Sequence, residues 1–277
     1  HLCLTAAFCP LGCGKIIGRG KMTFTPPAAQ DLTGKVALIT GTTSGLGKRF
    51  AQILGNAGAS VVITGRRVDR LEALAAELEG MGARVLPVAL DVTDVASIDA
   101  CVAEVVTELG GIDILINNAG MNVQASAVDL LPEDFDRVMD TNMRGAFFMA
   151  TRVGARMIAR GQGGSIINVA SIGAHTVLPG LATYCMSKAA VAMMTRSLAH
   201  EWARHKINVN AICPGFIETE LNSEWFETDG GQKQIKSWPR RRLGLESDLD
   251  GIVLLLASEQ GRLMTGSVTT IDDGQSL

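Results

Sequence analysis

The chain has 277 residues, of which 47% are hydrophobic and 19% charged, and its formal net charge is -3. This length and composition suffice for one large α/β domain with a sizeable core. The small negative charge gives no general attraction to nucleic acid or to an anionic membrane. No uninterrupted apolar run approaches the roughly 20 residues of a membrane helix. We therefore expect a soluble protein that binds neither nucleic acid nor membrane.

The cysteines and histidines give no sign of a metal site. The six cysteines are scattered, and Cys3, Cys9 and Cys13 have spacings unlike those of zinc ligands. The later cysteines are interpreted as small apolar residues in a reducing compartment. We predict no metal and a cytoplasmic location.

Residues 1–30 differ in pattern from the rest of the chain and are interpreted as an N-terminal extension. Residues 1–21 show no regular apolar period, and their basic residues come after the apolar stretch, which is atypical of a signal peptide. Met22 resembles a natural start, so the preceding residues are interpreted as a cloning remnant or upstream translation, with a genuine extension as the alternative. The Pro26-Pro27 pair predicts an extended lead into a single domain over residues 31–277.

From residue 35 onward, short apolar runs alternate with segments whose apolar residues recur at helical spacing. Strands are expected at 36–40, 61–64, 84–89, 112–116, 165–170, 207–212 and 267–271. Strands that are apolar throughout and separated by helices indicate a parallel sheet that is covered on both faces. The predicted fold class is α/β, with one doubly wound, mostly parallel sheet.

A glycine-rich turn follows the first expected strand and leads directly into a helix. It reads Thr40-Gly41-Thr42-Thr43-Ser44-Gly45-Leu46-Gly47. Such a turn points free backbone N–H groups and the positive end of a helix at one place, which suits a pyrophosphate. The spacing G-x-x-x-G-x-G and the lack of a Walker lysine favour a dinucleotide over ATP chemistry. A tight connection that binds nothing is the alternative interpretation.

A hydroxyl, a phenol and an amine occur close together in SIGAHTVLPGLATYCMSK, residues 171–188. If the segment from 181 onward is helical, Tyr184 and Lys188 are four residues apart on one face. A positive Lys188 would favour the phenolate and bring the tyrosine pKa from about 10 toward neutrality, which suits a general acid or base. The hydroxyl of Ser171 can hydrogen-bond a substrate oxygen. The structural alternatives are a packed tyrosine, a solvated lysine and a strand cap.

Together with Asn117-Asn118-Ala119-Gly120 after the fourth expected strand, these motifs resemble the short-chain dehydrogenase/reductase family. The resemblance runs from about residue 32 to 274, and it also includes Asp91, Asn142, Pro214, Gly215, Ile217 and Thr219. It implies a Rossmann-like domain that transfers a hydride between a nicotinamide cofactor and a carbonyl or secondary alcohol of a small organic substrate, such as a sugar acid, a 3-oxoacyl thioester, a cyclic ketone or a steroid.

The resemblance also implies roles for single residues. Tyr184 matches the family's acid/base, and Lys188 matches the lysine that lowers the tyrosine pKa and binds the nicotinamide ribose. Ser171 matches the serine that holds the substrate oxygen, and Asn142 matches the asparagine that holds a water in a proton relay. The implied cofactor contacts are Gly41, Thr43, Ser44, Gly45, Leu46, Gly47, Arg66, Arg67, Asp91, Val92, Asn118, Ala119, Gly120, Tyr184, Lys188, Pro214, Gly215, Ile217 and Thr219. For Asp91 a helix cap remains the alternative.

The end of the second expected strand indicates which cofactor is used. Sites for NAD place an acid there for the ribose 2′-hydroxyl, whereas sites for NADP place a base for the 2′-phosphate. Gly65 occupies the acidic position, and Arg66 and Arg67 follow with guanidinium groups that suit a phosphate. We expect NADP(H) to be preferred, with NAD possible. The alternative is that both arginines are solvated loop charges.

Residues 216–245 break the alternation, and the resemblance implies that they form a lid over the substrate. Its aromatic residues favour an apolar or ring-shaped substrate, the arginines at 240–242 suit a carboxylate or phosphate, and Gly230-Gly231 is a candidate hinge. Arg242 also fits a structural position. Near the C-terminus, Ile271-Asp272-Asp273-Gly274 departs from the family's frequent V-D-G-G pattern.

The resemblance also implies a homo-oligomer, a tetramer or a dimer, formed through long helices that include the one with Tyr184. A non-catalytic sensor or regulator that binds NADP(H) is the alternative function. It is disfavoured because all four residues of the family's catalytic set are present.

Overall fold

The computed structural model describes residues 30–218 and 223–277. One seven-stranded sheet, in the order β3-β2-β1-β4-β5-β6-β7, runs through the described residues, and every neighbouring pair is parallel. The strands are β1 (Val36–Ile39), β2 (Ser60–Gly65), β3 (Val85–Ala89), β4 (Ile114–Asn117), β5 (Gly164–Val169), β6 (Ile207–Pro214) and β7 (Val268–Ile271). The chain winds outward from β1 in both directions, which confirms the predicted doubly wound fold.

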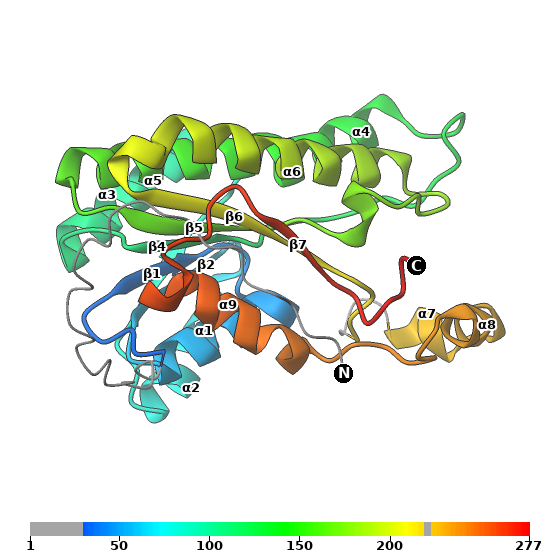
Figure 1. The fold of residues 1–277 in the computed structure, drawn as a ribbon, viewed down its shortest axis with the longest axis horizontal. Helices are drawn as coiled ribbons and strands as arrows, with labels where there is room; N and C mark the ends of the chain where they lie inside the picture. Colours follow the sequence, from blue (N-terminus) through cyan, green and yellow to red (C-terminus); the bar gives the residue numbers. More distant parts are fainter. Residues whose placement is uncertain (1–29, 219–222) are drawn as a thin grey trace, which may run out of the picture.

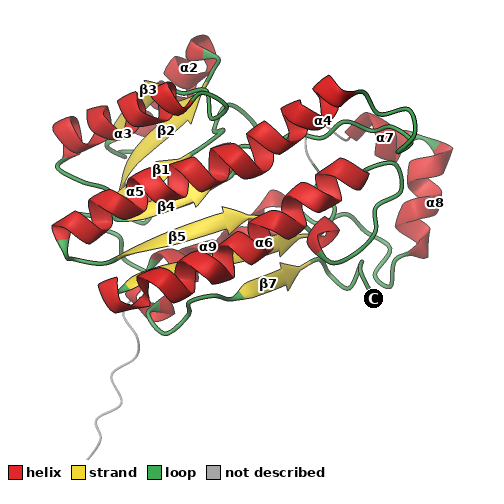
Figure 2. Cartoon of the chain, turned by 90° about the horizontal axis from the view of Figure 1, so that it is seen from above, coloured by secondary structure: helices red, strands yellow, loops and turns green. Residues whose placement is uncertain are grey.

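Helices cover both faces of the sheet (Figures 1 and 2). One face carries α1 (Gly45–Asn56), α2 (Val68–Gly80) and α9 (Asp250–Ala257), and the other carries α3 (Val95–Leu109), α5 (Ala146–Arg160) and α6 (Ala182–Trp202). The short helix α4 (Pro132–Met139) continues through a π-helical stretch, Asp140–Gly145, into α5. Within the described residues, no helix combines the length and apolarity needed to cross a membrane.

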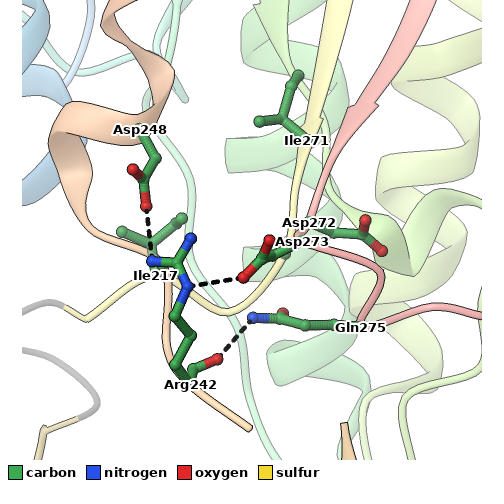
Figure 3. Close-up of a pocket in the computed structure, with 9 residues that line it drawn as sticks. Ile217, Arg242, Asp248, Ile271, Asp272, Asp273 and Gln275 are labelled. Carbon is green, nitrogen blue, oxygen red and sulfur yellow. Dashed lines mark hydrogen bonds and ion pairs between the residues drawn. The ribbon is translucent and has the colours of Figure 1, made fainter. Parts of the chain in front are cut away.

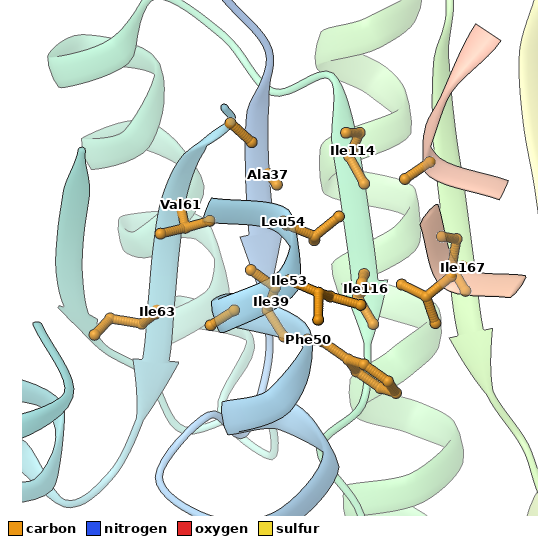
Figure 4. Close-up of a cluster of buried hydrophobic side chains, with 14 of the residues drawn as sticks. Ala37, Ile39, Phe50, Ile53, Leu54, Val61, Ile63, Ile114, Ile116 and Ile167 are labelled. Atoms are coloured by element: carbon orange, nitrogen blue, oxygen red, sulfur yellow. The ribbon is translucent and has the colours of Figure 1, made fainter. Parts of the chain in front are cut away.

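The side chains of β1 show why the sheet must be covered on both sides. Ala37 and Ile39 point toward α1, where Phe50 and Leu54 are fully buried against them (Figure 4). Leu38 belongs to the second core, on the side of α3 and α5. A strand that is apolar at every position therefore stabilises two cores at once, as its sequence pattern predicts.

Because all seven strands are parallel, their carboxyl ends lie along one edge of the sheet. The loops after β1, β4, β5 and β6 meet at this edge and contain Gly41, Asn118, Ser171 and Gly215. Residues that are far apart in the chain are thereby brought to one place, at the point where the strand order reverses between β1 and β4.

The segment predicted as a lid forms α7 (Ser223–Glu227) and α8 (Asp229–Ser237), which project from one end of the molecule (Figure 1). The rings of Phe216 and Trp238 stack with centroids 5.2 Å apart, and Phe226 packs edge-on against Phe216 at 5.7 Å. The aromatic residues thus form a small core within the segment predicted as a lid. The hinge expected at Gly230-Gly231 is wrong, because both residues lie in the first turn of α8, and a side chain at Gly231 would overlap the backbone of Trp225.

Candidate active site

The glycine-rich turn lies between β1 and α1, as the sequence predicts. Gly41 and Gly45 have φ angles of +71° and +55°, which favour glycine. The helix begins after Ser44, whose side chain does not cap it, and its first turn contains no acidic residue. The N–H groups at this helix end are therefore available for an anion.

Asn118, in the loop directly after β4, holds the turn in place. Its Nδ2 atom donates to the carbonyls of Thr40 and Gly41, at 2.9 Å and 3.1 Å. A Cβ atom at Gly47 would lie 2.6 Å from the same Nδ2 atom and would overlap the Gly41 carbonyl. Gly47 is thus required for the close packing of helix against turn, while the preceding residue, Leu46, packs against the apolar core.

Thr40 is a site residue whose role the sequence analysis missed. Its buried Oγ1 atom accepts hydrogen bonds from the backbone N–H groups of Asn118 and Ala119, each at 2.9 Å. This single hydroxyl joins the loop after β4 to the end of β1. A polar residue at the end of an apolar strand was the only signal that could have revealed it.

Ser171 and Tyr184 lie together beyond the end of β5. The Oγ atom of Ser171 accepts a hydrogen bond from the N–H of Gly173 at 3.1 Å, so its proton points elsewhere. Tyr184 lies in the first turn of α6. Burial raises the pKa of the phenol, and hydrogen bonding from Ser171 acts in the opposite direction. Desolvation has the larger effect, so the pKa of the phenol is raised in this structure, and the expected effect of Lys188 on it stays a prediction.

Lys188 is buried, which excludes the interpretation as a solvated surface lysine. Its Nζ atom donates to the carbonyl of Val169 at 2.8 Å and lies 5.7 Å from the centre of the Tyr184 ring. Burial lowers the pKa of Lys188 from 10.5 to about 8. The predicted spacing on one helix face is confirmed, since Tyr184 and Lys188 lie on successive turns of α6.

Asn142 lies in the π-helical stretch and is buried. Its Oδ1 atom accepts from the N–H of Met121, and its Nδ2 atom donates to the carbonyl of Met121, both at 2.8 Å. Nδ2 also donates to the hydroxyl of Ser187 at 3.0 Å. The asparagine therefore connects the loop after β4 with α6, and Ser187 is a second site residue that the sequence analysis missed.

Gly120 lies between Asn142 and Lys188. A Cβ atom at this position would lie 3.4 Å from Asn142 Oδ1 and 3.4 Å from Lys188 Nζ. A side chain at this position would contact both groups, so the glycine allows the β4 loop to lie close to the buried amine. The pyrophosphate expected at the glycine-rich turn and the ribose expected at the amine stay predictions.

The residues predicted to contact the adenosine end lie at the ends of β2 and β3. Arg66 and Arg67 are exposed, and Arg67 Nη2 donates to Thr43 Oγ1 at 2.6 Å. Asp91 Oδ1 accepts from the N–H of Thr93 at 3.0 Å and from its hydroxyl at 2.8 Å. The helix-cap alternative for Asp91 is wrong, because Asp94 caps α3. Asp91 is followed by Val92, which is buried.

The loop after β6 connects the site to the lid. The N–H of Gly215, which follows Pro214 at the end of β6, donates to the carbonyl of Ile271 at 3.0 Å. Ile217 is buried and forms a β-bridge with Gly244, at the far end of the lid segment. Thr219 lies outside the described residues.

The segment predicted as a lid is tied to the C-terminal segment by ion pairs that the sequence analysis missed. Arg242 lies between Asp248, at 3.4 Å, and Asp273, at 2.7 Å, beside a cavity of about 160 Å³ (Figure 3). Arg240 also pairs with Asp273, at 3.2 Å. The structural role considered for Arg242 is confirmed. Asp273 adopts φ +56°, which explains how an aspartate stands where the family's pattern has glycine.

Among the described residues, no group of three or more histidine, cysteine or acidic side chains is arranged to hold a metal ion. The three described cysteines, Cys101, Cys185 and Cys213, are free. His175, His200 and His205 have no role in the geometry of Tyr184 and Lys188.

Comparison with known proteins decides the family. A sequence model described as short chain dehydrogenase matches residues 35–230. The chain is a member of the short-chain dehydrogenase/reductase family. This short-chain dehydrogenase/reductase is 38% identical to the NAD-dependent glycerol dehydrogenase of Listeria innocua, over 89% of this chain and 96% of the relative. It is also 38% identical to the sorbitol dehydrogenase of Cereibacter sphaeroides, over 88% and 98% of the two chains.

Its structure resembles that of a gluconate 5-dehydrogenase from Burkholderia cenocepacia in complex with NADP and tartrate. The TM-score is 0.85 at 34% identity, and the match covers 89% of this chain and 96% of the other. This short-chain dehydrogenase/reductase is thus an NAD(P)-dependent oxidoreductase that transfers a hydride. The alternative function, a sensor without turnover, finds no support among these relatives.

Proposed function

We propose that this short-chain dehydrogenase/reductase uses NADP(H) to interconvert a carbonyl and a secondary alcohol, with Tyr184 as the proton donor or acceptor. The observation that carries the proposal is the geometry around the phenol: the buried amine of Lys188 lies 5.7 Å from its ring centre, and the nearby Ser171 side chain acts to lower its pKa. Both partners face the carboxyl edge of the sheet, where the glycine-rich turn lies.

When bound, the nicotinamide supplies or accepts the hydride. In the direction of reduction, Tyr184 donates its phenolic proton to the substrate oxygen, and in oxidation it takes that proton back. Ser171 can donate its hydroxyl proton to the same oxygen, while its Oγ atom accepts from the N–H of Gly173. Lys188 donates one N–H to the carbonyl of Val169, and its other N–H groups can donate to ribose hydroxyls and to the phenolate.

The structure fits a dinucleotide at the positions that the resemblance implies. Gly41, Gly45 and Gly47 carry no side chains at three positions of the turn, the helix end carries no acidic residue, and Gly120 puts no side chain beside Lys188. The exposed guanidinium groups at the end of β2 support a preference for NADP(H), since no acid is available there for the ribose 2′-hydroxyl.

For the substrate, we infer a small uncharged polyhydroxylated alcohol or the corresponding ketone. The lid arginines Arg240 and Arg242 are paired with Asp273 and Asp248, so their charge is already compensated. The glycerol and sorbitol dehydrogenases among the relatives have names that agree with such a substrate. A sugar acid, as in the name of the gluconate 5-dehydrogenase, is the competing class.

We also propose a homo-oligomer. Phe147 on α5, and Met186 and Met193 on α6, are 39%, 50% and 58% exposed, and two large helices with exposed apolar side chains suit a self-association surface. Leu198, further along α6, lies in the core and does not belong to this surface.

The decisive variant is Tyr184→Phe. It should reduce kcat by at least about 100-fold, the usual contribution of a positioned acid or base, while NADPH binding, measured by fluorescence titration, changes little. The substrate class is tested by a screen that measures NADPH oxidation and NADP⁺ reduction with glycerol, sorbitol, gluconate and their ketones. Wild-type turnover by the variant would refute the role of the tyrosine. Faster turnover of gluconate than of sorbitol would refute the substrate class alone.

Cofactor preference is tested by the ratio of kcat/KM with NADPH to that with NADH. The ratio should exceed one in the wild type, and Arg66→Asp should shift it toward NADH. A wild-type enzyme that prefers NADH would overturn the preference but not the chemistry.

A further inference from the structure

The turn between β1 and α1 is bound to the end of β2. Both the backbone N–H and the hydroxyl of Thr42 donate to the carbonyl of Thr64, at 2.9 Å and 3.2 Å. Thr42 and Thr64 are fully buried. These two hydrogen bonds hold the turn over the end of β2 and place Thr43 directly above Gly65.

Thr43 presents two different groups to this end of the strand. A Cβ atom at Gly65 would lie 2.8 Å from the methyl carbon Cγ2 of Thr43, closer than carbon atoms approach without displacement. The hydroxyl of Thr43 accepts the hydrogen bond from Arg67 Nη2 at 2.6 Å. The methyl group and the hydroxyl of one side chain therefore contact the two positions that the sequence connects with cofactor choice.

The backbone does not explain the glycine at position 65. Gly65 lies in β2, and it does not have the positive φ angle that favours glycine. The space above it is occupied by the methyl group of Thr43. The contact with Thr43, and not the strand conformation, thus restricts this position to glycine.

We propose that Thr43 is a cofactor-positioning residue with two effects, an inference that rests on the proposed use of NADP(H). Its methyl group excludes a side chain at position 65, including the acid that would bind the ribose 2′-hydroxyl of NAD. Its hydroxyl holds the Arg67 guanidinium at the end of β2, where a 2′-phosphate would lie. Thr43 thereby selects against NAD and for NADP, through its two neighbours.

The hydroxyl is tested by direct binding, without turnover. Thr43→Val keeps the shape of the side chain but removes the acceptor, and Thr43→Ser keeps the acceptor. By isothermal titration calorimetry, the Kd for NADP⁺ should rise about tenfold in Thr43→Val, since hydrogen bonds to charged groups are among the stronger ones. The serine variant should stay within about twofold of the wild type, and Thr43→Val should weaken NADP⁺ binding more than NAD⁺ binding. Equal NADP⁺ affinity in wild type and Thr43→Val would overturn the positioning role.

The methyl group is tested by pairs of variants. Gly65→Asp should lower the melting temperature and gain little affinity for NAD⁺, whereas Thr43→Ser/Gly65→Asp, which lacks the obstructing methyl, should recover the melting temperature and bind NAD⁺ about tenfold more tightly than Gly65→Asp. Gly65→Ala, alone and with Thr43→Ser, repeats the comparison without a charge, so it remains informative if Gly65→Asp does not fold. Identical melting temperatures with and without Thr43→Ser would overturn the exclusion.

The experiments distinguish a failure of the proposed cofactor preference from a failure of the role of Thr43. If the wild type binds NAD⁺ as tightly as NADP⁺, the preference is wrong, yet the melting temperatures of the Gly65→Ala pair still show whether Thr43 excludes side chains at position 65.

Discussion

The Nζ atom of Lys188 lies 5.7 Å from the centre of the Tyr184 ring, one helical turn further along α6. The carbonyl of Val169, at the end of β5, accepts a hydrogen bond from that amine at 2.8 Å. The helix fixes the spacing between phenol and amine, and the strand fixes the direction of the amine. Because both groups are desolvated, each is held toward its uncharged form: the pKa of the phenol is raised and that of the amine is lowered.

The buried amine should give the protein a distinctive dependence of stability on pH. Lys188 has a folded-state pKa of about 8, lowered from 10.5, so the unfolded chain binds more protons between these values and stability rises with pH there. Relative to Lys188→Met, the unfolding free energy of the wild type should therefore increase by up to about 3 kcal/mol from pH 8 to pH 10.5. Urea unfolding at several pH values measures the difference, and the exposed Lys233→Met serves as control. If the unfolding free energies of wild type and Lys188→Met changed with pH in the same way, the burial of a titrating amine would be contradicted.

The close packing of the glycine-rich turn predicts a clear effect of one methyl group. Gly47→Ala should destabilise the fold by about 1–3 kcal/mol and weaken NADPH binding, because the new Cβ atom overlaps the Gly41 carbonyl. Gly80→Ala, at the end of α2, has no atom within 4 Å of the added Cβ and should be neutral or slightly stabilising. Thermal melting with and without NADPH separates the two effects. Equal melting temperatures of the two variants, with and without NADPH, would show that the turn rearranges to accommodate the added methyl group at little cost.

The hydrogen bonds of Asn142 predict that this residue stabilises the folded site, in addition to the role in a proton relay that the resemblance implies. Asn142→Ala removes the hydrogen bonds to Met121 and Ser187 and leaves half-buried backbone groups of Met121 without these partners, which should cost about 1–3 kcal/mol. Ser187→Ala removes only one of these bonds and should cost less. Urea unfolding of both variants measures which of them loses more unfolding free energy. If Ser187→Ala is the more damaging, the asparagine is not the centre of this network.

The ion pairs of Asp273 predict that the C-terminal segment controls the lid. Asp273→Asn tolerates the positive φ angle but loses the attraction to Arg240 and Arg242, so proteolysis within residues 223–245 should become several-fold faster. Substrate KM should rise more than kcat falls. Asp273→Gly also loses the ion pairs but fits the backbone better, so it should melt at a higher temperature than Asp273→Asn while showing the same faster proteolysis. An unchanged proteolysis rate in both variants would mean that the aromatic contacts alone hold the lid.

Local sequence patterns determine most of the architecture. Continuous apolar runs separated by helical periods predict the parallel sheet, and each expected strand appears within a few residues of its predicted position, because burial on both faces leaves a strong signal. The spacing of Tyr184 and Lys188, and the turn around Gly41, could be predicted for the same reason: each lies within one element or one connection.

The tertiary structure decided what depends on neighbours that are distant in the chain. The sequence contains Thr40, Ser187 and Asp273, but their partners Asn118, Asn142 and Arg242 are found only when strands and helices are assembled. The pKa of Tyr184 illustrates the limit. A spacing of four residues predicts that the amine lowers it, whereas the fold surrounds the phenol with protein, and the loss of hydration raises it. Sequence spacing determines which groups can meet, while the solvation that sets their charge depends on every element packed around them.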